Sequence, residues 1–64
     1  GHLLAAGLSE REAQICELIA SGHTAKTLAR KLDIAESSVI TYRKRAYQKL
    51  GISRKSDLIE RLKQ

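Results

Sequence analysis

Residues 24–51 read TAKTLARKLDIAESSVITYRKRAYQKLG, and this stretch predicts two helices joined by a tight turn. The first helix begins after Thr24, a residue type that commonly caps helix N-termini. Asp33 follows this short helix at the point where the chain must turn. A longer helix is expected over residues 36–50, and Gly51 ends it because glycine readily adopts a left-handed backbone. A short helix, a turn and a longer basic helix form the helix-turn-helix layout.

The longer predicted helix has two faces of different character. One face carries apolar side chains at steps of three and four residues: Val39, Tyr42, Ala46 and Leu50. The opposite face is mostly polar and consists of Ser37, Ile40, Thr41, Lys44 and Gln48. Leu28 and Leu32 of the short helix are expected to pack against Val39 and Ala46. The polar face is therefore left free for a partner.

The flanking segments predict one helix on each side of this pair. Ser9 and Glu12 have the spacing of a capping box, and the helix that they open ends at Gly22. Ser53 is expected to cap the last helix. Its apolar stripe consists of Leu58, Ile59 and Leu62. We expect an all-α four-helix bundle containing a helix-turn-helix, as a single domain over residues 1–64, with Gly1-His2 interpreted as a cloning remnant.

The composition argues against several classes of protein. No apolar run approaches the roughly 20 residues of a membrane span. A membrane-surface helix needs a broad exposed apolar face, whereas helix 36–50 uses its apolar stripe for the core, so we favour no membrane partner. Cys16 is the single cysteine and is expected to be a small buried apolar residue. His2, His23 and Cys16 do not have the spacing of metal ligands, and no catalytic constellation is present. We therefore expect no enzyme, no metal and no cofactor.

The positive charge is concentrated in the second part of the chain. The net charge is +5, and residues 23–64 contain eleven basic and four acidic side chains. Such a surface favours a polyanionic partner, and the second helix of a helix-turn-helix enters the major groove of double-stranded DNA. Two alternatives stay open: a basic helical module that binds an acidic protein or a membrane surface, and a sigma-factor-like polymerase element.

The free face of helix 36–50 provides the candidate DNA-contacting residues. Hydroxyl groups, branched apolar side chains and lysine suit base edges, which selects Ile40, Thr41 and Lys44 as base-reading residues. Groups at helix starts and nearby cations suit phosphate oxygens. The candidate phosphate contacts are Thr24, Lys26, Ser37, Ser38, Tyr42, Arg45 and Lys49.

Several short motifs between Leu8 and Leu62 together resemble the C-terminal DNA-binding domain of LuxR-type transcriptional regulators. The motifs are Leu8-Ser9-Glu10-Arg11-Glu12, then Thr24-Ala25-Lys26-Thr27-Leu28-Ala29, and then Ile34, Ser38, Val39, Lys49, Leu50, Gly51 and Ile52. The resemblance implies a four-helix domain that binds DNA as a dimer, in the cytoplasm of a bacterium. It also implies base contacts at Thr41 and Lys44, and RNA polymerase as a further partner.

The same resemblance places the last helix at the dimer contact. We therefore expect Leu58, Ile59 and Leu62 to support a weak homodimer, with one of the three facing the core.

The chain also departs from the family pattern. Asp33 replaces a common glycine, Ala35-Glu36 replaces a Ser-Pro-like helix entry, and Tyr42 replaces a common histidine. Thr27 stands where glutamate is usual, from which we expect no second capping box.

Overall fold

The computed structural model describes residues 2–63, without the side chains of His2 and Leu4. It is all-helical over this range, which confirms the expected fold class. The helices are α1 (His2–Ala5), α2 (Glu10–Ala20), α3 (Ala25–Leu32), α4 (Glu36–Leu50) and α5 (Lys55–Leu62). The one-turn helix α1 adds to the expected four. The interpretation of Gly1-His2 as a cloning remnant falls on Gly1, which lies outside the described residues, and on His2, whose side chain is not described.

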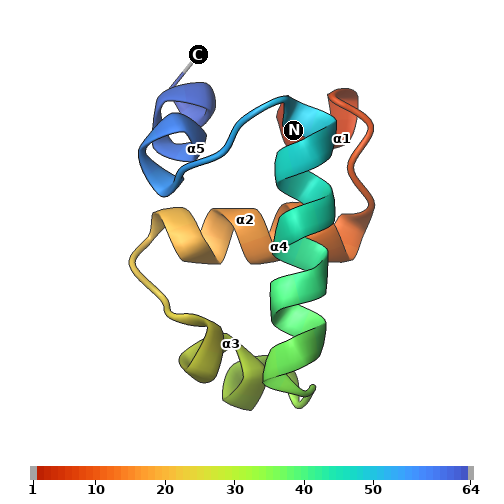
Figure 1. The fold of residues 1–64 in the computed structure, drawn as a ribbon, viewed down its shortest axis with the longest axis vertical. Helices are drawn as coiled ribbons and strands as arrows, with labels where there is room; N and C mark the ends of the chain where they lie inside the picture. The colour runs from red at the N-terminus through yellow and green to blue at the C-terminus, as the bar shows by residue number, and fades with distance from the viewer. Residues whose placement is uncertain (1, 64) are drawn as a thin grey trace.

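Helix α4 is the axis of the molecule. It crosses α2, with α3 packed at its N-terminal end and α5 lying beside its C-terminal end (Figure 1). The molecule measures 29 × 20 × 19 Å along its principal axes. Helix α2 contacts each of the other helices and packs most extensively against α4, whereas α3 packs mainly against α4.

The core takes one apolar face from each longer helix. Its largest fully buried side chains are those of Ile15, Leu28, Leu58, Val39 and Cys16. Burying one large aliphatic side chain stabilises a fold by about 1.5–3 kcal/mol, so a chain this small depends on nearly all of them. Cys16 is a buried free thiol, as expected, and burial raises its pKa to about 11. No helix among residues 2–63 is long and apolar enough to cross a membrane.

The helix N-termini confirm one capping expectation and overturn another. Ser9 and Glu12 form the expected capping box at α2. Thr24 and Thr27 form a second one, in which the Thr27 hydroxyl accepts from the Thr24 N–H at 2.9 Å. The expectation that Thr27 removes this box is wrong because a threonine hydroxyl replaces the glutamate carboxylate as the acceptor. The N-terminus of α3 is therefore closed by two reciprocal hydrogen bonds between Thr24 and Thr27.

The turns differ in how well their sequence predicts them. Asp33 adopts the left-handed backbone that the turn requires, with φ 56° and ψ 49°. Ala35 is the N-cap of α4 and makes no side-chain cap hydrogen bond, as an alanine must. The prediction that Ser53 caps the last helix is wrong, since α5 starts at Lys55 with Arg54 at the N-cap. The Ile52 N–H donates to the Tyr47 carbonyl at the end of α4, so Ile52 still belongs to the C-terminal cap of α4. Two further residues, Ser53 and Arg54, precede the first residue of α5.

Two long-range contacts hold the C-terminal end of α4. The Lys49 ammonium donates to the Glu12 carboxylate, with Nζ and Oε1 2.7 Å apart. The Glu12 side chain is only 5% exposed and also accepts from the Ser9 N–H at 2.8 Å. In addition, the Arg61 guanidinium of α5 donates to the Leu50 carbonyl at 2.9 Å. These bonds tie α4 to α2 and to α5 and thereby set its orientation.

The Glu12 contacts predict a specific sensitivity to acid. The hydrogen bond from Lys49 and that from the Ser9 backbone hold the pKa of Glu12 below its ordinary value of 4.5. A carboxyl with a lowered folded-state pKa stabilises the fold above its ordinary value, and this contribution is lost as the pH falls through the lowered value. Glu12→Gln removes it. We expect the free energy of unfolding of the variant to lie below that of the wild type at neutral pH.

The measurement is urea unfolding of both chains from neutral pH to about pH 3. The difference between the two free energies of unfolding should narrow as the pH falls below the ordinary pKa of a glutamate side chain. A gap that stays constant over this range contradicts the assignment.

Candidate nucleic-acid interface

Helix α4 exposes the face that the sequence left without a core partner. Val39, Ala46 and Leu50 are buried, and Tyr42 packs half-buried against the core. The opposite face is exposed along the whole helix, at Ser37, Ile40, Thr41, Lys44 and Gln48. The structure therefore brings all three predicted base-reading residues onto one continuous accessible surface.

The chemistry of this face is specific at two positions. The Thr41 hydroxyl donates to the Ser37 carbonyl at 2.9 Å, so its oxygen lone pairs and its methyl group remain available to a ligand. Ile40 is 44% exposed and is the one large apolar side chain that is exposed among the described residues. An acceptor, two apolar groups and the Lys44 ammonium can together distinguish the donor, acceptor and methyl positions of base edges.

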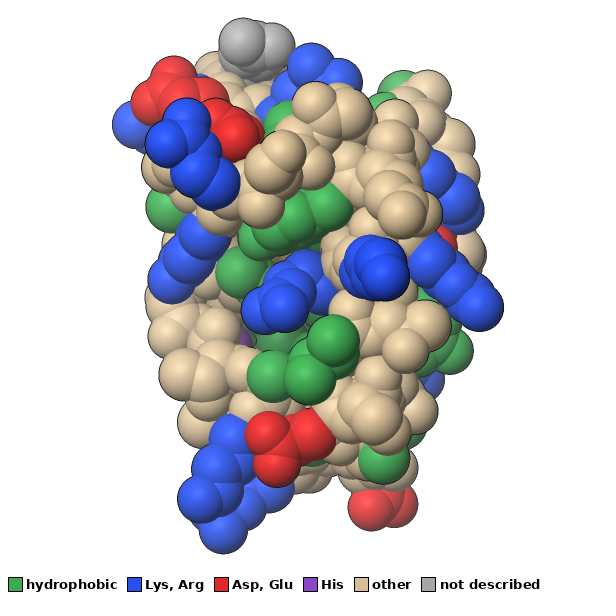
Figure 2. All heavy atoms as spheres, viewed as in Figure 1, with side chains coloured by type: hydrophobic (Ala, Val, Ile, Leu, Met, Phe, Trp, Pro, Cys, Tyr) green, Lys and Arg blue, Asp and Glu red, His purple; other side chains and the backbone are tan. Residues whose placement is uncertain are grey.

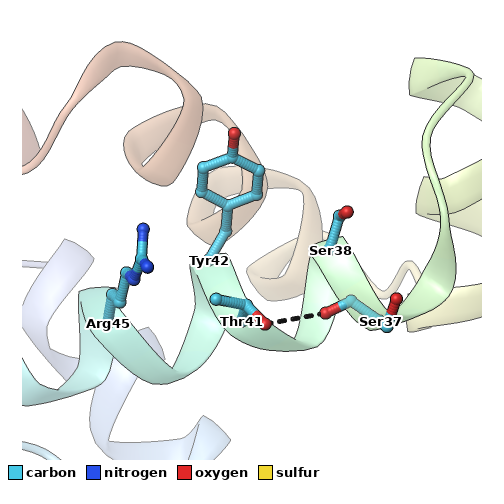
Figure 3. A pocket seen from close by; sticks show the side chains of 5 residues that line it. All are labelled: Ser37, Ser38, Thr41, Tyr42 and Arg45. Atoms are coloured by element: carbon cyan, nitrogen blue, oxygen red, sulfur yellow. Dashed lines mark hydrogen bonds between the residues drawn. The ribbon is translucent and has the colours of Figure 1, made fainter.

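A shallow hollow of about 230 Å³ lies beside this face, lined by residues of α4 alone. Its lining residues are Ser37, Ser38, Thr41, Tyr42 and Arg45. Ser38, Tyr42 and Arg45 project to the same side of the helix, with Ser37 and Thr41 next to them (Figure 3). Four of the predicted phosphate contacts thus lie together. They offer three hydroxyl groups and one guanidinium, a set that suits anionic oxygens.

The predicted contacts on α3 lie at its N-terminus. Thr24 and Lys26 are both exposed, and the Thr24 hydroxyl accepts from the Thr27 N–H at 3.2 Å. The first backbone N–H groups of a helix and a nearby cation favour an anion. Thr24 therefore caps the helix and stays accessible at the same time.

Lys49 differs from the other predicted phosphate contacts because its ammonium already has a partner. It donates to Glu12, and 43% of its side chain remains exposed. Its position as a phosphate contact stays a prediction. Its contact with the buried carboxylate is a structural role that sequence spacing could not reveal, because the two residues are 37 positions apart.

The side of α4 facing α5 carries groups that the sequence prediction did not assign. Arg43 and Tyr47 of α4 and Lys55 of α5 line two adjoining hollows there. Figure 2 shows Lys and Arg side chains gathered over this part of the surface, with apolar side chains between them. A helical wheel could have separated Arg43 from the core face, but only the placement of α5 brings Lys55 beside it.

The three predicted dimer residues are not equivalent. Leu58 has no exposed surface and packs in the core, so it is the one of the three that faces the core, and it is not available for a dimer contact. It lies on α5, which packs against α2. Ile59 and Leu62 are half-buried.

Among the residues with described side chains, no group of His, Cys, Asp and Glu could hold a metal ion.

Comparison with known proteins relates this chain to bacterial regulators. A family model described as "Bacterial regulatory proteins, luxR family" matches residues 6–62. The chain is similar to the HTH-type transcriptional regulator MalT of Klebsiella pneumoniae (strain 342), with 35% identity over 57 residues. MalT of Yersinia pestis (strain Pestoides F) is 34% identical over 53 residues.

The shared region is most of this chain and a small part of those regulators. The match to the Klebsiella protein covers 89% of the chain and 6% of the relative. For the Yersinia protein the values are 83% and 6%. No solved structure matches the chain.

The Glu12–Lys49 contact predicts that Lys49→Ala acts mainly on folding. Removing the ammonium leaves a buried carboxylate without its charged partner, at a cost of about 1–2 kcal/mol after allowance for the exposure of Lys49. Arg45→Ala provides the matched control, because Arg45 is exposed and has no ion-pair partner among the described side chains. Thermal unfolding should show a clear loss for the first variant and little for the second. Equal stability of the two variants contradicts the structural role.

Proposed function

Because the chain belongs to the luxR family of bacterial regulatory proteins, we propose that it binds specific sequences of double-stranded DNA and thereby regulates transcription. The observation that carries this proposal is the exposed face of α4, whose opposite face is fully used by the core. A helix with its side chains is about 10–12 Å across, and the major groove is about 12 Å wide. Helix α4 is therefore the element that enters the groove.

Base reading is assigned to the centre of the exposed face. Ile40 presents its side chain to a thymine methyl group, and Lys44 reaches guanine acceptors. Thr41 accepts from an amino group of adenine or cytosine, because its own hydroxyl hydrogen is committed to the Ser37 carbonyl. The three together read adjoining base pairs.

Phosphate contacts are assigned to groups on two elements that flank the reading face. Ser37, Ser38, Tyr42 and Arg45 lie around the hollow on α4. Thr24 and Lys26 stand at the start of α3. Contacts of this kind fix the register of a protein on DNA without reading its sequence.

A weak homodimer is assigned to the outer surface of α5. Ile59 and Leu62 are half-buried and thus still have apolar surface to offer to a second copy. Two reading helices related by this contact would occupy half-sites about one helical turn, or roughly 10 bp, apart. The sequence-specific complex is then formed by two chains.

The assignment of roles predicts that Lys26→Ala and Lys44→Ala differ. Lys26→Ala removes a phosphate contact, so it should weaken all duplexes about equally and reduce the slope of log affinity against log salt by roughly 0.9. Lys44→Ala removes a base contact, so it should cost about 1–3 kcal/mol on the selected sequence and much less on random DNA. Fluorescence anisotropy over a range of salt concentrations measures both effects.

Circular dichroism of each variant serves as the control for folding. Equal losses on selected and random DNA for Lys44→Ala would show that this residue does not read bases. A wild-type chain whose affinity for DNA is independent of salt would remove the nucleic-acid proposal as a whole.

The dimer assignment predicts a separate effect for Leu62→Glu. A carboxylate at this half-buried position should disfavour contact between two chains, because its desolvation is costly. Sedimentation on a duplex with two half-sites should then show one bound chain at concentrations where the wild type binds as two. Binding to a single half-site should persist. If the variant loses its helical signal instead, Leu62 belongs to the core and the dimer assignment loses its support.

A further inference from the structure

A basic groove runs between α4 and the start of α5, on the side of α4 away from Ser38, Tyr42 and Arg45. Its larger part has a volume of about 500 Å³. A second part of about 290 Å³ continues toward the turn between α2 and α3, where His23 and Thr24 line it. The two parts share Arg43, Tyr47 and Lys55, so they form one continuous depression.

The charge of this groove is positive. Arg43 and Lys55 are exposed, and Lys44 joins them at the edge that the groove shares with the reading face. None of these three forms an ion pair within the part of the chain whose side chains are described. No acidic side chain lines either part of the groove. Three cations without a neutralising neighbour fit a ligand that carries closely spaced negative charges.

The groove also offers neutral hydrogen-bond donors. Tyr47 is half-buried, and its phenol is protonated at neutral pH and can donate, since its ordinary pKa of about 10 is raised further by burial. Ser53 and Lys55 stand on either side of Arg54, the N-cap of α5, which makes no side-chain cap hydrogen bond. The first backbone N–H groups of α5 therefore have no side-chain acceptor at Arg54, and such groups favour anionic oxygens.

From this arrangement we propose that the groove holds the sugar-phosphate backbone of one DNA strand, with Arg43 and Lys55 as its phosphate contacts. The proposal rests on the proposed function, because Ile40 and Lys44 belong both to the groove and to the reading face. A helix in the major groove has one backbone on each side. The hollow at Ser38, Tyr42 and Arg45 faces one of them, and the groove faces the other. Helix α4 is thus held from both flanks.

The test begins with the duplex that the wild-type chain selects from random sequences. Lys55→Ala and Arg43→Ala should each weaken binding to selected and random duplexes by the same factor. Each should also lower the slope of log affinity against log salt by about 0.9. A fourfold rise in salt should then reduce the affinity of the variant by a factor about three times smaller than the factor for the wild type. Lys31→Ala is the matched control, because Lys31 is also exposed and helical but lies on α3 and lines neither part of the groove. Its salt slope should change less.

A second measurement locates the contact on the DNA. Duplexes with a single neutral methylphosphonate at each backbone position should identify two groups of sensitive phosphates, one on each strand of a half-site. Lys55→Ala should remove the sensitivity of the phosphates nearest Lys55 on one strand and leave the group on the other strand unchanged. Arg45→Ala should show the reverse pattern.

Each outcome decides the proposal. If Lys44→Ala weakens specific binding while Lys55→Ala and Arg43→Ala behave as Lys31→Ala, the groove does not hold DNA, and the proposed function stands without it. Binding of an acidic protein that depends on Lys55, together with DNA binding that does not, overturns the proposal in the same way. If the wild-type chain selects no duplex, the groove proposal and the proposed function both fail.

Discussion

The carboxylate of Glu12 connects the N-terminus of α2 to the C-terminal end of α4. It closes the capping box at the start of α2 and binds the ammonium of Lys49 in the last turn of α4. The group is nearly completely buried, so its charge is tolerable only while both donors are in place. Helix α2 packs against every other longer helix, and this ion pair fixes how α4 crosses it.

This constraint explains why one face of α4 is available for a ligand. With Glu12 holding Lys49 and Arg61 holding the Leu50 carbonyl, the C-terminal end of α4 is fixed on two sides. Its N-terminal end is fixed by α3, whose start is closed by the paired hydroxyls of Thr24 and Thr27. The helix cannot rotate about its axis without breaking these contacts. The face that carries Ile40, Thr41 and Lys44 is therefore held outward by a pre-organised frame, which would lower the entropic cost of the binding that we propose.

The elements of this frame that depend on neighbours in sequence were predictable. The spacing of Ser9 and Glu12 gave the start of α2, the apolar period of helix 36–50 gave its buried face, and Asp33 adopts the turn conformation that its position required. The elements that depend on distant residues were not predictable. The partner of Lys49 lies 37 positions away, and Lys55 reaches the side of Arg43 only through the path of the chain after Gly51. Leu58 was correctly placed on an apolar stripe, but only packing distinguishes a core residue from a contact residue on such a stripe.

The central claim is that the exposed face of α4 lies in the major groove, and methylation protection tests it most directly. Dimethyl sulfate modifies the N7 atom of guanine in the major groove and the N3 atom of adenine in the minor groove. Applied to a selected duplex with the wild-type chain bound, it should show that guanine N7 atoms are protected within each half-site. The N3 atoms of adenines in the same half-sites should stay reactive. Protection of adenine N3 with guanine N7 left reactive would place the chain in the minor groove and contradict this account of α4.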